Sequence, residues 1–208
     1  MTDIEIISPA HREQGIRMTE HDDIPELTEA QRLRWKAASS DMREMSAGLR
    51  DGTATHEEMQ GALNRLLSCD IDRSTLLNSL HIPDDAGIYA AGLEQILRRI
   101  PDGWGRWISH DAGWYPIVTR CDEQLAAIDP DYIVHQVKEK FGTLRYYCGP
   151  SSDMHSTHLR EQFSVIVREA EAASARTCER CSAAGSLRDR RHWLKTLCDA
   201  CAEALNYP

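Results

Sequence analysis

Four cysteines follow one another in a C-x2-C-x16-C-x2-C pattern: Cys178, Cys181, Cys198 and Cys201. Two C-x-x-C turns at this separation can present four thiolates to a single tetrahedral zinc ion. A shell closed by four thiolates leaves no coordination position for a substrate or a water molecule. We therefore predict one structural Zn²⁺ ion with these four residues as its ligands.

Closely spaced cysteines can also hold an iron–sulfur cluster or form redox disulfides. A thioredoxin-like redox site, however, has one C-x-x-C pair beside a β-α-β pattern, which this sequence lacks. The motifs G-x-S-x-G, H-E-x-x-H, G-x-G-x-x-G and the P-loop are absent as well. The sequence thus predicts a protein that is not an enzyme, with a zinc-dependent enzyme as the weakest alternative.

Charge is distributed unevenly along the chain, whose formal net charge is -9. Residues 1–30 hold eight Asp or Glu against two Arg, whereas the zinc module is basic. An acidic protein binds nucleic acid only where its cations gather locally. Two such sets are candidate nucleic-acid or partner contacts. They are Arg188, Arg190, Arg191, Trp193 and Lys195 in the zinc module, and Lys138, Lys140 and Arg145 further upstream.

The elements that must position these residues divide the chain into four parts. Residues 1–26 are acidic and aperiodic, which is typical of an irregular arm. Residues 27–102 form a helical region, because two capping-box patterns, Thr28 with Gln31 and Thr55 with Glu58, each precede apolar residues at helical spacing. Shorter helices are predicted over residues 74–80 and 85–100.

The second half mixes helix and strand. An apolar stripe from Trp114 to Ile128 predicts a helix, alternation from Tyr132 to Cys148 predicts a β-hairpin, and Thr157 can cap a long helix. These make a domain over residues 103–175, followed by a zinc-ribbon-like module over residues 176–208. The fold class is therefore α+β, and the tryptophan-rich segment from residue 103 is predicted to pin an irregular connector to the core.

Three stretches resemble a known set of proteins. They are Gly113-Trp114-Tyr115-Pro116, the hairpin Val137-Lys-Glu-Lys-Phe-Gly-Thr-Leu-Arg-Tyr-Tyr147, and Thr177-Cys178 with Leu197-Cys198. The chain resembles short, uncharacterised bacterial, prophage and bacteriophage proteins that have a KEKFGxLR(F/Y)Y hairpin and a C-terminal cysteine cluster. The resemblance covers roughly residues 103–203. It implies a phage-related origin and a shared module, and it carries over no catalytic residues.

The predicted function is a non-catalytic, zinc-stabilised binding protein that docks on a host protein or nucleoprotein complex. An inhibitor of host defence or of nucleic-acid machinery is favoured, with the acidic arm as a charge mimic. The alternative is a nucleic-acid-binding regulator that uses the basic zinc module. Seven cysteines could form a disulfide framework, but the chain opens without a basic start and an apolar segment, which favours a reducing compartment. We therefore expect a cytoplasmic protein without membrane contact.

Overall fold

The computed structural model describes residues 24–68, 70–151 and 157–207. Within them the fold is α+β, with seven α-helices, two 3-10 turns and two small sheets. The elements are α1 (Glu29–Asp51), α2 (His56–Leu67), α3 (Arg73–Asn78), η1 (Gly87–Tyr89), α4 (Ala90–Arg98), β1 (Ile108–Ser109), η2 (Ala112–Trp114), α5 (Tyr115–Ile128), β2 (Ile133–Lys140), β3 (Thr143–Gly149), α6 (Thr157–Ser174), β4 (Ser186–Arg190), β5 (Trp193–Leu197) and α7 (Asp199–Ala204).

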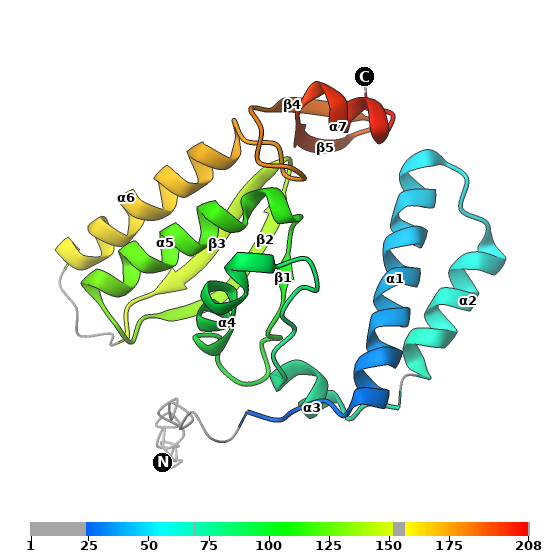
Figure 1. Cartoon of the computed structure of the whole chain (residues 1–208), viewed down its shortest axis with the longest axis horizontal. Helices are drawn as coiled ribbons and strands as arrows, with labels where there is room; N and C mark the ends of the chain where they lie inside the picture. The colour runs from blue at the N-terminus through cyan, green and yellow to red at the C-terminus, as the bar shows by residue number, and fades with distance from the viewer. Residues whose placement is uncertain (1–23, 69, 152–156, 208) are drawn as a thin grey trace, which may run out of the picture.

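The main core lies between one face of the three-stranded sheet and the helices α4, α5 and α6 (Figure 1). Strands β2 and β3 form the predicted hairpin, and β1 runs parallel to β2. Alternation places Val137, Leu144 and Tyr146 in the core. The opposite face of the hairpin carries no helix from this core.

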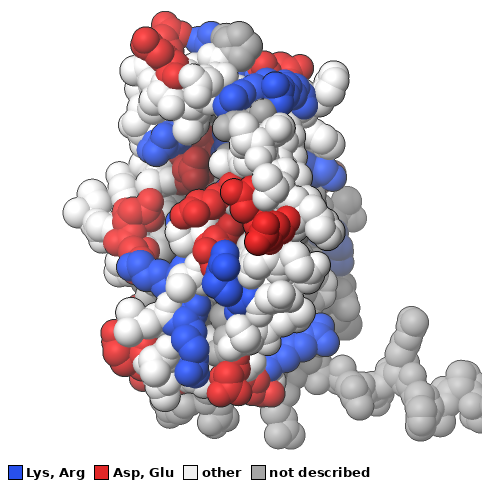
Figure 2. Space-filling view, turned by 90° about the vertical axis from the view of Figure 1, so that its right-hand side faces the viewer, with Lys and Arg blue, Asp and Glu red and all other residues white. Residues whose placement is uncertain are grey.

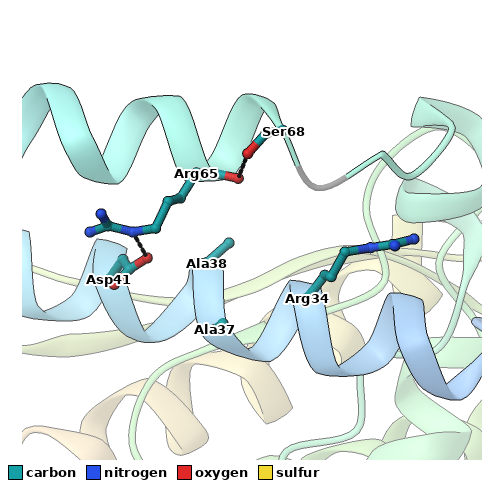
Figure 3. A pocket seen from close by; sticks show the side chains of 6 residues that line it. All are labelled: Arg34, Ala37, Ala38, Asp41, Arg65 and Ser68. Carbon is teal, nitrogen blue, oxygen red and sulfur yellow. Dashed lines mark hydrogen bonds and ion pairs between the residues drawn. The ribbon is translucent and has the colours of Figure 1, made fainter.

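Helices α1 and α2 form an antiparallel pair on the other side of the molecule (Figure 1). Both predicted capping boxes are present, at Thr28 and at Thr55. Figure 3 shows a small open pocket between the two helices, where Arg65 Nε donates to Asp41 Oδ2 at 2.5 Å and Ala38 is buried. An exposed ion pair over small side chains holds two helices in register and offers no converging ligand groups, so the pocket has a packing role.

The segment from residue 103 agrees with its prediction only in part. Trp107 is half-buried and its ring packs edge-on against His81, whereas Trp104 is largely exposed. The connector is also fixed by Arg106, which is buried and donates to the carbonyl oxygens of Ile100 and Asn78. It also contains the short strand β1, because Ile108 pairs with Val137 across the sheet. A buried guanidinium is tolerated here because backbone carbonyls and Asp102 satisfy it.

Most of the predicted acidic arm, residues 1–23, lies outside the described residues. Residues 24–26 are described and line a cleft beside α1. Among the described residues, every helix is too short or too polar to cross a bilayer.

Candidate metal centre and its surroundings

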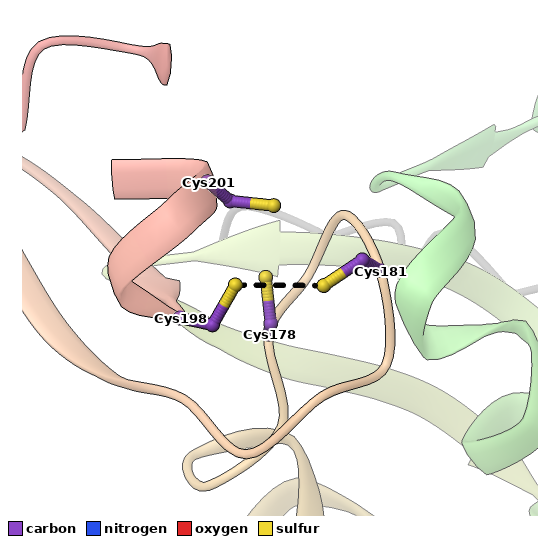
Figure 4. A group of neighbouring side chains, drawn as sticks. All are labelled: Cys178, Cys181, Cys198 and Cys201. Carbon is purple, nitrogen blue, oxygen red and sulfur yellow. Dashed lines mark hydrogen bonds between the residues drawn. The ribbon is translucent and has the colours of Figure 1, made fainter. Parts of the chain in front are cut away.

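The four cysteines meet at one point in space although they come from two separate segments. Cys178 and Cys181 belong to the loop between α6 and β4, while Cys198 caps α7 and Cys201 lies within it (Figure 4). All four sulfur atoms lie within 4.8 Å of one another, and Cys181 Sγ is 3.5 Å from Cys198 Sγ. Metal–sulfur bonds of about 2.3 Å place the sulfurs of a tetrahedral site about 3.8 Å apart. The cluster can therefore hold a metal ion.

Backbone turns bring each C-x-x-C pair into position. In the first pair the amide of Cys178 donates to Ala183 O at 2.7 Å, and the amide of Ser182 donates back to Cys178 O at 3.1 Å. Gly185 closes this turn, since a Cβ there would lie 2.8 Å from Cys178 N. In the second pair Cys198 is the N-cap of α7, so Cys201 follows one helical turn later.

Hydrogen bonding prepares one of these thiols for metal binding. Burial alone would raise the pKa of Cys178, but the backbone amides of Cys198, Cys181 and Arg180 donate to its sulfur and lower the pKa to about 7. Burial raises the pKa of Cys201 to about 12, with neighbouring thiols adding to the effect. Four adjacent thiolates therefore need a bound cation to coexist, as a thiolate-coordinated metal provides.

The metal module is fixed to the body through η2, the 3-10 turn that leads into α5. The amide of Gly113 donates to Glu179 O at 2.7 Å, and Trp114 Nε1 donates to Thr177 O at 2.8 Å. A Cβ on Gly113 would lie 2.2 Å from Cys178 O, so only glycine fits this contact. The Gly113-Trp114 sequence thus serves the junction between the two parts of the protein.

A buried ion pair reinforces the same junction. Lys195 Nζ lies 2.7 Å from Glu179 Oε2 and 3.6 Å from Asp111 Oδ2. Burial raises the pKa of Glu179, and although burial alone would lower the pKa of Lys195, the two carboxylates outweigh it and raise that pKa. Sequence reasoning assigned Lys195 to a nucleic-acid surface and missed Glu179, because nothing in a sequence marks which acid a lysine will meet.

The other predicted contacts of the zinc module are also engaged within the protein. Arg188 pairs with Asp199, and Arg190 Nη1 donates to Leu205 O at 2.7 Å. Arg191 lies in the β4–β5 turn with its guanidinium against Gly52 at the end of α1. Trp193 is 45% exposed. Arg188, Arg190, Trp193 and Lys195 therefore lie on one face of the ribbon, where acids or a backbone carbonyl of the same chain engage the three cations.

The three predicted cations upstream lie on the face of the β2–β3 hairpin that points away from the helices. Lys138 is directly opposite Arg145, and Lys140 is opposite Thr143. Their side chains lack carboxylate partners among the described residues. On the side of α1 and α2, by contrast, both charge signs are interspersed (Figure 2).

A cleft of about 1240 Å³ separates α1 from β1 and β5. His110 lines it and is 9% exposed. Its Nδ1 donates to Asp111 O at 2.9 Å, whereas its Nε2 has no hydrogen-bond partner among the described residues. Burial lowers the pKa of His110 from 6.5 to about 4, so the imidazole is neutral at pH 7.

His110 should make the folding stability depend on pH. Between pH 6.5 and about 4 the unfolded chain binds a proton that the folded imidazole does not, so stability falls as the pH falls. The loss at pH 5 relative to pH 7 is about 2 kcal/mol. Urea unfolding at both pH values measures the free energy of unfolding that is lost between pH 7 and pH 5. In His110→Asn this loss should be smaller than in the wild type by about 2 kcal/mol. Equal pH dependence in the variant and the wild type would contradict the assignment.

No family model, no curated protein and no solved structure matches this chain. The function is therefore inferred from the geometry of the chain itself.

Proposed function

We propose that this protein is a non-catalytic binding protein, stabilised by one structural zinc ion, that docks on a macromolecular complex of a host cell. In this proposal it is phage-encoded, acts in the host cytoplasm and inhibits host defence or nucleic-acid machinery. The phage origin is proposed from the sequence resemblance of residues 103–203 alone, since the comparisons with known proteins found no match.

The cysteine cluster supports a structural rather than a catalytic metal. Four sulfur ligands complete a tetrahedral shell, and catalytic zinc sites keep one position for water or substrate. Two C-x-x-C turns with four soft thiolate ligands favour zinc. The surrounding core is small, consisting of Cys178, Leu197, Ala202 and Tyr207. Such a module depends on its metal for stability, which is the role that we assign to the ion.

The observation that carries the proposal is the surface of the β4–β5 ribbon. Its cations Arg188 and Lys195 are paired with acids of the same chain, whereas Leu187, on one face of the ribbon, is 55% exposed and Trp193, on the other face, is 45% exposed. Acids of the same chain already neutralise these cations, so little positive charge remains to bind phosphates. Exposed aromatic and aliphatic side chains on a rigid element favour a protein partner. The ribbon therefore supports docking on protein over direct nucleic-acid binding.

The ribbon is also held rigidly. Thr196 Oγ1 donates to Gly142 O at 2.6 Å in a buried contact between β5 and the β2–β3 turn. Leu187 packs against the same turn, since a Cβ on Gly142 would lie 2.4 Å from its Cδ1. A surface fixed at both the metal and the hairpin loses little conformational entropy on binding.

A tagged pull-down from host lysate tests this function. We expect a near-stoichiometric protein partner that nuclease treatment does not remove. Leu187→Ser with Trp193→Ser should reduce its recovery about 10-fold or more, since buried aromatic anchors carry much of an interface's energy. Ile88→Ser is the control, because Ile88 is also apolar and is 90% exposed but lies on η1.

Two results would contradict the proposal. One is recovery of nuclease-sensitive material alone, and the other is equal loss in the Ile88 control. The same assay after deletion of residues 1–26 tests the acidic arm as a charge mimic, and full retention of the partner would remove the arm from the mechanism.

A further inference from the structure

The outward face of the β2–β3 hairpin is a concentrated positive surface. Because side chains alternate along a strand, six positions of the two strands point away from the helical layer. They are Gln136, Lys138, Lys140, Thr143, Arg145 and Tyr147. Half of them are cations and none is an acid. This composition is unusual for a protein whose net charge is -9.

Within this outward face, Lys138 and Arg145 are cross-strand neighbours. Like charges directly opposite each other destabilise a sheet. In the β4–β5 ribbon, Asp199 and Glu179 neutralise the cross-strand pair of Arg188 and Lys195. In the hairpin, by contrast, neither Lys138 nor Arg145 forms an ion pair with a described residue. Arg145 Nη1 donates instead to Thr143 Oγ1 and Leu144 O. The face therefore retains a positive potential that an anionic ligand would neutralise.

Two aromatic rings stand at the ends of the same face. Tyr147 is 43% exposed, and Lys138 Nζ lies 5.5 Å from its ring centroid. Phe141, in the turn, is 65% exposed, and Lys140 Nζ lies 5.2 Å from its ring centroid. Cations interleaved with exposed aromatic rings are the pattern by which proteins hold single-stranded nucleic acid.

The backbone conformation of Phe141 is an independent indication that this face binds a ligand. Phe141 and Gly142 form a two-residue turn in which both φ angles are positive, +55° and +75°. Asparagine, aspartate or glycine normally fills the first position, because a bulky side chain there is strained by about 1 kcal/mol or more. Burial does not compensate Phe141 for this strain. A strained, exposed aromatic residue is better explained by a ligand than by folding.

We propose that the outward face of the β2–β3 hairpin binds single-stranded nucleic acid. Lys138, Lys140 and Arg145 contact phosphates, and Phe141 and Tyr147 stack on bases. The eight residues of β2 extend over about 26 Å, which spans about four nucleotides. In a duplex the bases stay stacked on one another, so the rings of Phe141 and Tyr147 cannot stack on them. This site adjoins the ribbon only at the Phe141–Gly142 turn, against which Leu187 packs, and it does not depend on the protein-docking function.

Fluorescence anisotropy with labelled oligothymidylate and oligouridylate of about 12 nucleotides tests the site. With three phosphate contacts, the slope of log K against log salt should be about -2, so affinity should fall about 20-fold from about 50 to about 200 mM salt. Lys138→Gln and Arg145→Gln should each reduce the slope by about 0.7. Arg188→Gln removes the same charge from the ribbon and should leave binding unchanged.

Phe141→Asn separates binding from folding. Asparagine tolerates positive φ, so the thermal midpoint should stay the same or rise, while loss of one stacked base should weaken binding about 10-fold. Four results would overturn the proposal. They are no binding by the wild type at low salt, an unchanged affinity of Phe141→Asn, an equal effect of Arg188→Gln, and affinity for a duplex or a polyglutamate peptide equal to that for the single strand.

Discussion

Replacing Cys178 with serine should release the metal ion and unfold residues 176–205. Cys178 is fully buried and belongs to the small core of the module, together with Leu197, Ala202 and Tyr207. Binding of structural zinc supplies about 10–16 kcal/mol of folding free energy in comparable modules, far more than a core of this size provides. Metal analysis should show less than one bound ion per chain, and limited proteolysis should cut within the module.

Cys148→Ser is the matched control for this experiment. Cys148 is a half-buried thiol at the end of β3 and lies outside the cluster. Its serine variant should keep the metal and the protease resistance of the module. Full metal occupancy in Cys178→Ser would refute the assignment of the ligands, and metal loss in both variants would indicate a general effect of removing a thiol.

Replacing Arg99 with methionine should destabilise the main domain by about 3 kcal/mol. Arg99 Nε donates to Asp122 Oδ1 at 2.8 Å, and Asp122 is only 2% exposed. Removing one partner of a buried ion pair leaves an uncompensated charge, which is far more costly than losing a surface pair. Tyr132, whose hydroxyl also donates to Asp122, cannot neutralise that charge. Guanidinium unfolding followed by circular dichroism measures the change.

The neighbouring residue provides the control for Arg99. Arg98 pairs with Glu94 on the partly exposed side of α4, so Arg98→Met should cost only a few tenths of a kcal/mol. The double variant Arg99→Met with Asp122→Leu should recover much of the loss, because it removes the unpaired charge. Equal destabilisation by Arg98→Met and Arg99→Met would show that burial of the pair is unimportant.

Local signals in the sequence predicted most of the secondary structure. The capping boxes at Thr28 and Thr55 and the alternation that continues through Lys140 each depend on residues a few positions apart. Strand β1 was missed because it has two residues and exists only through pairing with Val137, a distant part of the chain. The anchoring role of Arg106 was missed for the same reason, since its acceptors include the carbonyl of Asn78.

The candidate site shows the same division. Spacing alone predicted the meeting of the four cysteines, since a C-x-x-C turn fixes the separation of its two thiols. Charge counting did not distinguish the cations of the ribbon from those of the hairpin. That distinction depends on strand register and on which acids the fold places nearby, such as Glu179 beside Lys195. The sequence therefore identified the cations but not which of them face solvent unpaired.

The contact between Gly113 and the metal module has a consequence for synthesis of the chain. Gly113, in η2 just before α5, donates to Glu179 O, and Cys201 is translated long after η2. Ribosomes add about 5–20 residues per second, so several seconds separate the two events. Until the cluster closes, Trp114 lacks its acceptor at Thr177 and the interior of the domain stays open to chaperones and proteases. Closure of the cysteine cluster is therefore a late step that completes the junction between the two parts of the chain.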